Sequence, residues 1–167
     1  MSQAFINEDD AHDAGDLLDR PQSAEPNYVT AKGLAQLRQK ADELAARRAS
    51  LAGKRNDPLG SRQFQQAERD LLYFQSRLES AILVDPATQP ADAVHFGASV
   101  EARDGEGALL AFSIVGLDEA DAAEGKVGWT SPIASALMGA RAGDKVVWKR
   151  EAGDAVLEIL SIRYPRD

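Results

Sequence analysis

The chain has no cysteine in its 167 residues, which excludes disulfide bonds, thiolate metal sites and cysteine nucleophiles. It also lacks any apolar run near the roughly 20 residues that a membrane-spanning helix needs. Its first residues are soon followed by acids and show neither the basic start nor the long apolar stretch of a secretory signal peptide. We therefore expect a cytoplasmic protein with no membrane partner, and 44% apolar residues are enough for a packed core.

Positive charge is scarce and unevenly distributed in this chain of net charge −8. Residues 1–28 hold seven acids and one arginine (−6), residues 29–84 hold ten bases and six acids (+4), and residues 85–167 hold eight bases and fourteen acids (−6). An acidic chain without a basic, aromatic-rich surface is poorly suited to grip nucleic acid by itself. We expect a protein partner, with nucleic acid involved only indirectly through that partner.

The N-terminal segment, residues 1–27, is too acidic and too poor in apolar residues to pack alone. We predict an acidic, disordered tail there. The apolar pairs Phe5-Ile6 and Leu17-Leu18 could still dock elsewhere, with a solvated arm as the alternative.

An apolar ladder with heptad spacing runs through the next part of the chain. Its members are Leu34, Leu37, Ala41, Leu44 and Leu51, then Phe64, Ala67, Leu71, Phe74, Leu78 and Ala81, with Arg48 in the remaining seam position. Such spacing predicts two helices, at about 31–52 and 61–83, that pack along one seam. We expect Thr30 to cap the first of them.

The segment between these helices contains several helix breakers. Gly53, the Asn56-Asp57-Pro58 turn and Gly60 each interrupt a helix, so the two halves must fold back antiparallel. We predict an antiparallel coiled-coil finger over residues 28–84, with an exposed tip and arms of roughly 30 to 35 Å.

The C-terminal half is organised differently. Two prolines mark a linker at residues 85–91. Strands are expected at 94–100, 109–115, 126–129, 145–148 and 155–162, and a short helix follows Ser131-Pro132. This pattern predicts a small α+β domain over residues 92–167, with a bent, mostly antiparallel sheet.

Residue types that carry catalysis or bind metals are not grouped in the sequence. No glycine-rich loop joins a strand to a helix, and the two histidines, His12 and His95, stand far apart. No serine has a matching histidine constellation. We therefore expect no catalytic residue, no metal site and no cofactor. The acidic cluster Asp118-Glu-Ala-Asp121 misses the calcium-loop spacing and by itself is typical of a solvated loop.

Several ordered strings nevertheless carry a resemblance to a known family. They are Tyr28-Val-Thr-Ala-Lys-Gly-Leu34, Val94-His-Phe-Gly97, Ile114-Val-Gly-Leu-Asp-Glu-Ala-Asp121, Ser131-Pro-Ile-Ala-Ser-Ala-Leu-Met-Gly139, Gly143-Asp144 and Ile159-Leu-Ser-Ile-Arg-Tyr164. Over about residues 28–165 the chain resembles the Gre transcript-cleavage factors, GreA and GreB. The resemblance implies an N-terminal antiparallel coiled-coil finger and a C-terminal domain of the FKBP-like α+β fold.

The resemblance also implies binding to bacterial RNA polymerase, with the C-terminal domain at the rim of the secondary channel and the finger inside it. In the family, Asp and Glu at the tip help to hold a second magnesium ion, and the polymerase then cleaves backtracked RNA. A carboxylate pair suits this task because Mg²⁺ prefers hard oxygen ligands. The factor would then be a regulator of the polymerase and not an enzyme.

This chain departs from the family at the tip. It offers the single carboxylate Asp57, flanked by Lys54, Arg55 and Arg62, in place of an acidic pair. The finger is also shorter by about ten residues per arm, which is roughly 15 Å of reach. We therefore predict a polymerase-binding protein that modulates elongation without efficient stimulation of cleavage.

Docking is expected at the residues that lie in the matching motifs. They are Asp118, Glu119, Ser131, Pro132 and Ile133, since acids can meet a basic rim and Pro132-Ile133 offers an apolar contact. The structural alternative is that Ser131-Pro132 only starts a helix and Ile133 only fills the core.

Three other functions stay open. An active cleavage factor could use Asp57 with Glu68 or Asp70 as magnesium ligands, although both lie at least two turns along the second helix. A prolyl isomerase would need an aromatic-lined pocket built from Phe96, Phe112, Trp129, Trp148 and Tyr164, which the strands need as core. A module that self-associates through its helices is the third, whereas we expect a monomer because the ladder is satisfied within one hairpin.

Overall fold

The computed structural model describes residues 21–166, so the predicted tail lies largely outside the described residues. The described residues form two compact units. One, which we call the hairpin, contains residues 37–80 together with 21–26. The other, which we call the body, contains residues 27–36 and 81–166. The first turn of the hairpin's first helix therefore belongs to the body.

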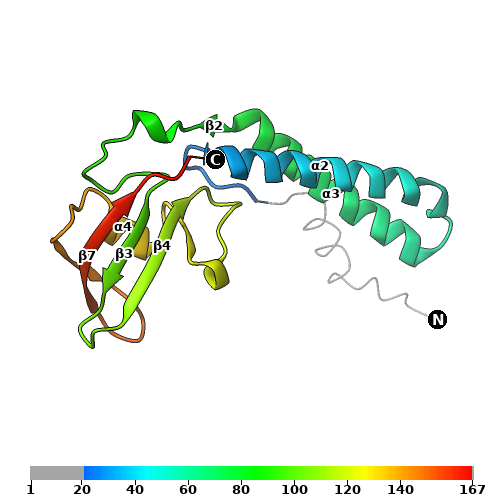
Figure 1. Ribbon diagram of the computed structural model, residues 1–167. Helices are drawn as coiled ribbons and strands as arrows, with labels where there is room; N and C mark the ends of the chain where they lie inside the picture. The colour runs from blue at the N-terminus through cyan, green and yellow to red at the C-terminus, as the bar shows by residue number, and fades with distance from the viewer. Residues whose placement is uncertain (1–20, 167) are drawn as a thin grey trace, which may run out of the picture. The chain divides into compact units, whose positions relative to one another are not determined.

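The hairpin is built from α2 (Ala31–Leu51), the 3-10 turn η1 (Ala52–Lys54) and α3 (Pro58–Ser80), and the two long helices run side by side (Figure 1). Two clusters of buried side chains lie between them. Their members are Ala41, Leu44 and Leu71, with Phe74 and Leu78 packed against them, and Leu51, Phe64 and Ala67. The apolar ladder thus faces inward, because residues three and four apart share one side of a helix.

Helix α3 begins earlier and ends earlier than the predicted span of 61–83. It starts at Pro58 because Asp57 acts as its N-cap, with the Asp57 carboxylate accepting a hydrogen bond from the Gly60 amide. Asn56 and Asp57 do turn the chain, as predicted, whereas Pro58 and Gly60, predicted as helix breakers, lie in the first turn of α3. It ends at Ser80 because β2 (Ile82–Leu83) pairs in parallel with β1 (Tyr28–Val29), a pairing that the sequence did not predict.

The body contains a five-stranded sheet in the order β5-β4-β3-β7-β6. Its strands are β3 (Ser99–Arg103), β4 (Leu109–Val115), β5 (Lys126–Gly128), β6 (Lys145–Trp148) and β7 (Ala155–Arg163). Neighbouring strands are antiparallel except β4 and β5, which are parallel. The predicted α+β class with a mostly antiparallel sheet is confirmed.

The strand predicted at 94–100 is wrong over most of its length, since β3 starts only at Ser99. The Val94 amide donates instead to the Ala140 carbonyl, and Gly97 adopts a positive φ of 88° that turns the chain. The apolar residues of this string pack into the core from a loop and not from a strand.

The core of the body lies between the sheet and the short helix α4 (Pro132–Leu137). Its fully buried side chains include Val94, Ala98, Ile114, Leu137 and Leu157, each 0% exposed. Within the described residues, no helix is both long enough and apolar enough to cross a membrane.

Candidate functional site

The sheet brings the two predicted docking motifs to the same edge. β4 and β5 are parallel neighbours, so their carboxyl ends lie together. Asp118 and Glu119 follow β4, and Ser131 and Pro132 follow β5. The Ser131 amide donates to the Gly128 carbonyl at 2.9 Å, which turns the chain directly into α4.

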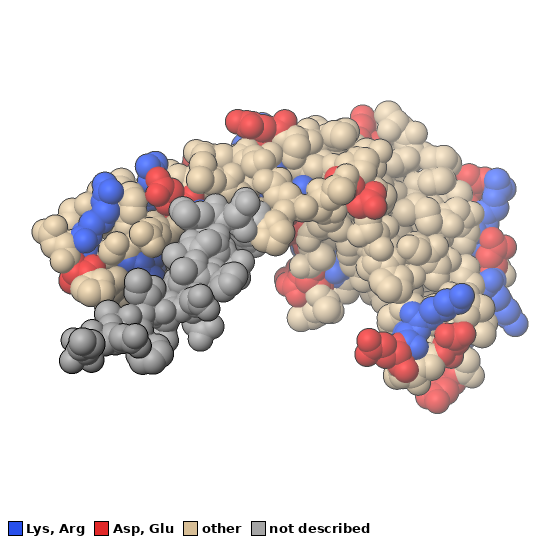
Figure 2. Space-filling model, turned by 180° about the vertical axis from the view of Figure 1, so that it is seen from behind, with Lys and Arg blue, Asp and Glu red and all other residues tan. Residues whose placement is uncertain are grey.

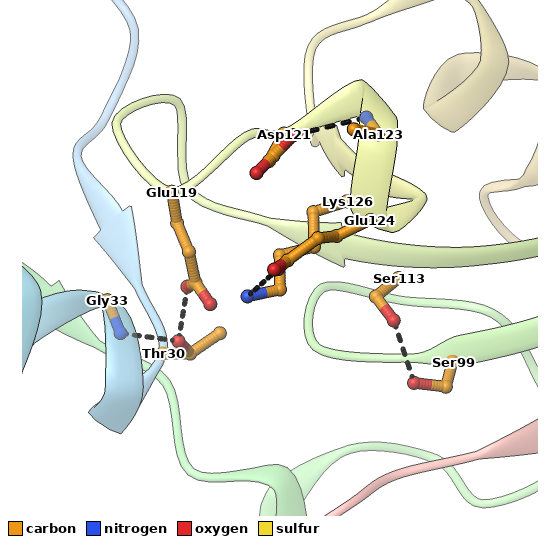
Figure 3. Close-up of polar contacts among 9 residues, drawn as sticks. All are labelled: Thr30, Gly33, Ser99, Ser113, Glu119, Asp121, Ala123, Glu124 and Lys126. Atoms are coloured by element: carbon orange, nitrogen blue, oxygen red, sulfur yellow. Dashed lines mark hydrogen bonds and ion pairs between the residues drawn. The ribbon is translucent and has the colours of Figure 1, made fainter.

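Glu119 is not an exposed acid. Its side chain is 9% exposed, and its Oε1 accepts a hydrogen bond of 2.5 Å from the Thr30 hydroxyl (Figure 3). The same hydroxyl oxygen accepts the Gly33 amide at 2.9 Å, which confirms Thr30 as the cap of α2. A Cβ at position 33 would lie 2.6 Å from Glu119 Oε1, so a larger residue there would force the Glu119 carboxylate to shift. Glu119 is therefore engaged within the body and holds the first turn of α2.

The other predicted docking residues divide between surface and core. Ser131 is the N-cap of α4 and accepts the Ala134 amide at 3.3 Å, and Pro132 occupies the first helical turn. Pro132 is exposed, Asp118 is half-buried, and Ile133 is only 5% exposed within the core. Because Ile133 is buried, its side chain is not available to a partner. The structural alternative thus holds for Ile133, while Pro132 remains on the surface.

A cavity of about 560 Å³ lies beside Glu119 in the body. Its polar lining includes Thr30, Glu119 and Lys126, and Leu83, Phe96 and Ile114 form part of its apolar wall. The hydroxyls of Ser99 and Ser113 face each other at 3.0 Å at one side (Figure 3). The sequence did not predict this cavity, because its lining comes from segments far apart in the chain.

One cation that lines this cavity, Lys126, forms an ion pair. Lys126 Nζ lies 3.1 Å from Glu124 Oε2. The hydrogen bond and charge of Lys126 lower the pKa of Glu124, and the hydrogen bond from Glu124 raises the pKa of Lys126. Both shifts favour the charged forms at neutral pH. The pair therefore lacks the neutral base or acid that proton transfer would need.

The aromatic side chains of the body mostly serve its core. Among the aromatic residues considered for an isomerase pocket, only Phe96 lines the cavity. Trp129 packs edge-on against Tyr28 at 5.1 Å between ring centroids, and Phe112 packs against Trp148 at 5.8 Å. The cavity beside Glu119 is therefore not an aromatic-lined pocket of the kind that a prolyl isomerase would use.

At the tip of the hairpin, the single carboxylate has a structural partner. Asp57 Oδ1 accepts the Gly60 amide at 2.5 Å and thereby caps α3. Nearby, the Arg55 guanidinium stacks 4.1 Å from the centre of the Phe64 ring. Figure 2 shows basic side chains on the surface at this free end. Within the described part of the chain, no group of three or more histidine or acidic side chains could hold a metal ion.

The two acids considered as extra magnesium ligands are engaged as well. Glu68 Oε1 lies 2.9 Å from Arg48 NH2, so Arg48 turns outward from the seam to form an ion pair. Asp70 Oδ1 lies 3.2 Å from Arg69 NH2. Each carboxylate would have to break its ion pair with an arginine before it could bind a metal cation.

Comparison with known proteins adds a family to this geometry. A family model described as "Transcription elongation factor, GreA/GreB, C-term" matches residues 89–164. The chain is 42% identical over 106 residues to the transcription elongation factor GreB of Neisseria meningitidis serogroup A, a match that covers 63% of this chain and 65% of that protein. It is 34% identical over 151 residues to GreB of Xanthomonas axonopodis pv. citri, covering 81% of this chain and 90% of the relative.

A solved structure, the GreA/GreB factor from Nitrosomonas europaea, is also similar, with 21% identity and a TM-score of 0.41. That match covers 82% of this chain and 98% of the other. A likeness at this level adds nothing to the argument about function. The match to the Neisseria protein spans less than two thirds of that relative's length.

These relatives correct one expectation from the sequence. The expectation that the factor is a regulator of the polymerase and not an enzyme is wrong. GreA and GreB factors stimulate the cleavage of the transcript by RNA polymerase, so the relatives take part in a catalysed reaction.

Proposed function

The chain belongs to the GreA/GreB family of transcription elongation factors, and from that premise we propose that it binds bacterial RNA polymerase at the secondary channel and modulates elongation with little stimulation of RNA cleavage. The body is FKBP-like and docks at the channel rim. The hairpin is a short coiled coil that enters the channel, and the protein acts as a monomer.

One observation carries this proposal: the only carboxylate at the tip is the N-cap of α3. Asp57 Oδ1 is engaged by the Gly60 amide, and the flanking Lys54 and Arg55 are cationic. A magnesium ion bound there would have one carboxylate, two nearby positive charges and a competing backbone donor. Since Mg²⁺ requires several oxygen ligands in near-octahedral geometry, the tip is a poor site for delivering it.

Docking is supported by the edge that follows β4 and β5. Pro132 provides an exposed apolar contact and Asp118 a carboxylate, while Ser131 caps α4 and so sets the position of Pro132. Glu119 contributes by holding the loop that carries Asp118 against the first turn of α2. Ile133 contributes from the core.

The proposal is tested with purified RNA polymerase complexes that have been backtracked artificially. We expect little RNA cleavage when the chain is added, and reduced cleavage when it competes with an active GreB factor. The double variant Asp118→Asn, Pro132→Ala should lose this competition. Glu151→Gln, which removes one exposed negative charge from the turn after β6, should retain it.

Two results would contradict the proposal. Cleavage that increases strongly with the added chain would show that the tip does support a metal, and Asp57→Asn would then identify the ligand. Failure to compete with GreB at any concentration would show that the chain does not occupy the channel.

A further inference from the structure

A polar groove of about 710 Å³ runs along one face of the hairpin. Lys40, Arg47 and Ser50 line it from α2, and Gln63 and Gln66 line it from α3. Leu44 and Ala67, which also line it, belong to the buried seam of the hairpin. The two helices by themselves thus leave a channel with an apolar base and a polar rim.

Four charged side chains line this groove, the bases Lys40 and Arg47 and the acids Glu43 and Asp70. Once Asp70 is paired with Arg69, two bases face one acid. That acid, Glu43, accepts a hydrogen bond of 3.1 Å from the Gln39 amide group. Lys40 and Arg47 are exposed, and neither forms an ion pair with a carboxylate of the described residues. Residues 37–80 as a whole hold nine bases and six acids.

The chain itself contains a segment of complementary charge. Residues 1–20 hold six acids and one arginine, and they lie outside the described residues. Among them Asp13, Asp16 and Asp19 flank the apolar pair Leu17-Leu18. Acids with a short apolar element match a groove that has exposed Lys40 and Arg47 on its rim and a base of leucine and alanine.

The described part of the chain brings this segment close to the groove. The Ser76 hydroxyl on α3 donates a hydrogen bond of 3.3 Å to Gln22 Oε1, so the chain leaves the described region beside α3. Asp70 is six residues from Ser76, or about 9 Å along the helix, and Gln63 is about 20 Å away. An extended chain spans up to about 3.5 Å per residue, so residues 13–19 can reach the groove.

We propose that the acidic segment 1–20 binds in cis to this groove on the hairpin, with its aspartates against Lys40 and Arg47 and its leucine pair over the base. The contact needs little intrinsic affinity, because a short tether gives an effective concentration in the millimolar range. Bound in this way, the segment covers the basic face of the hairpin and competes with any other anionic partner for it. The inference goes beyond the proposed function and does not depend on it.

The experiment uses the absence of cysteine, which allows disulfide trapping in the full-length chain without background thiols. One cysteine replaces His12 in the acidic segment, and a second replaces Ser50 at the groove. The matched control places the second cysteine at Ala49, which is exposed on α2 but does not line the groove. We expect the His12→Cys, Ser50→Cys protein to form its disulfide roughly fivefold faster or more, since the tether is the same in both proteins.

The faster disulfide formation at position 50 should depend on charge and should not depend on protein concentration. The advantage of position 50 should fall in about 0.5 M salt, because screening weakens contacts between exposed charges. It should also fall when Lys40 and Arg47 are changed to Gln, or when Asp13, Asp16 and Asp19 are changed to Asn. Neutralising Glu106, Glu151 and Asp154 of the body instead should leave the rate unchanged. Equal rates at positions 49 and 50, or a rate that rises with protein concentration and so indicates a second copy as the occupant, would overturn the proposal.

Discussion

The hairpin and the body bury their apolar residues to different extents. In the body, Ile114, Leu137 and Leu157 are 0% exposed, because the sheet and α4 surround them on all sides. In the hairpin, Leu44 and Leu51 each stay 8% exposed, because two helices cover only one face of each other. The body has the core of a folded domain, whereas the hairpin is a two-layer structure whose stability depends on a narrow seam and on its end groups.

The largest effect on stability should come from replacing one buried leucine with alanine in each of the two units. Leu137→Ala in the body should cost about 4 kcal/mol of unfolding free energy, near the upper end for buried leucine, because its surroundings cannot collapse. Leu71→Ala in the hairpin, 5% exposed, should cost about 2 kcal/mol, because solvent and neighbouring side chains can fill the space. Urea unfolding of both variants measures the difference. Equal costs would mean that the hairpin seam is packed as tightly as the body.

The backbone at the tip of the hairpin should be rigid at Gly60 and tolerant of substitution at Gly53. A Cβ at position 60 would lie 1.9 Å from the Lys54 carbonyl oxygen, whereas a Cβ at Gly53 would meet nothing within 4 Å. Gly60→Ala should therefore cost about 2 kcal/mol, as expected for overpacking, and Gly53→Ala less than about 0.5 kcal/mol. Thermal unfolding of the two variants provides the measurement. Similar midpoints would show that the tip backbone moves freely.

The cap of α3 should have a smaller effect. Asp57→Ala leaves the Gly60 amide without its acceptor and should cost about 1 kcal/mol. Asp42→Ala, a substitution at an exposed position inside α2, should change the unfolding free energy by less than about 0.5 kcal/mol. Circular dichroism during unfolding follows both variants. If Asp57→Ala leaves the unfolding free energy unchanged, the Asp57 carboxylate is not needed as a cap and is available for another role, including metal binding.

The smallest effect concerns the pH dependence of the body. The Tyr164 hydroxyl donates to the Ala93 carbonyl and accepts the His95 amide, and burial raises its pKa above the ordinary 10.0. The folded state then keeps the phenol proton where the unfolded state has lost it, so the stability present below pH 10.0 falls as the pH rises further. Tyr164→Phe should remove this part of the decline, and Tyr28→Phe should retain it. Urea unfolding between about pH 8 and 11 tests the point. An identical decline in both variants would show that Tyr164 does not contribute.

Local patterns predicted the two long helices well and their ends poorly. The ladder from Leu37 to Leu78 follows from helical spacing alone. Asn56-Asp57-Pro58 was expected to form a turn because proline and asparagine commonly do so, but the same residues can also cap and start a helix. Here both occur, because the chain turns at Arg55 and Asn56, and Asp57 then caps the helix that runs from Pro58 to Ser80.

The docking edge shows the limit of sequence reasoning about sites. The motifs at Asp118-Glu119 and Ser131-Pro132-Ile133 were visible, and the sheet does bring them to one edge. The sequence did not show which of these side chains are exposed. An acid in a loop and an isoleucine in a short helix give the same sequence pattern whether they face solvent or the interior. Glu119 and Ile133 turned out to face inward.

The sequence by itself determined the two long helices, the opposite charges of tail and hairpin, and the family, because these depend on spacing, composition and ordered strings that can be recognised without coordinates. Only the tertiary structure decided that β1 pairs with β2, that Asp57 is committed as a cap, and that Glu119 reaches Thr30, 89 residues away in the chain. Contacts of this kind form when distant segments pack against one another. The free energy of that packing, more than the local preference of any residue, selects the partner of each polar side chain.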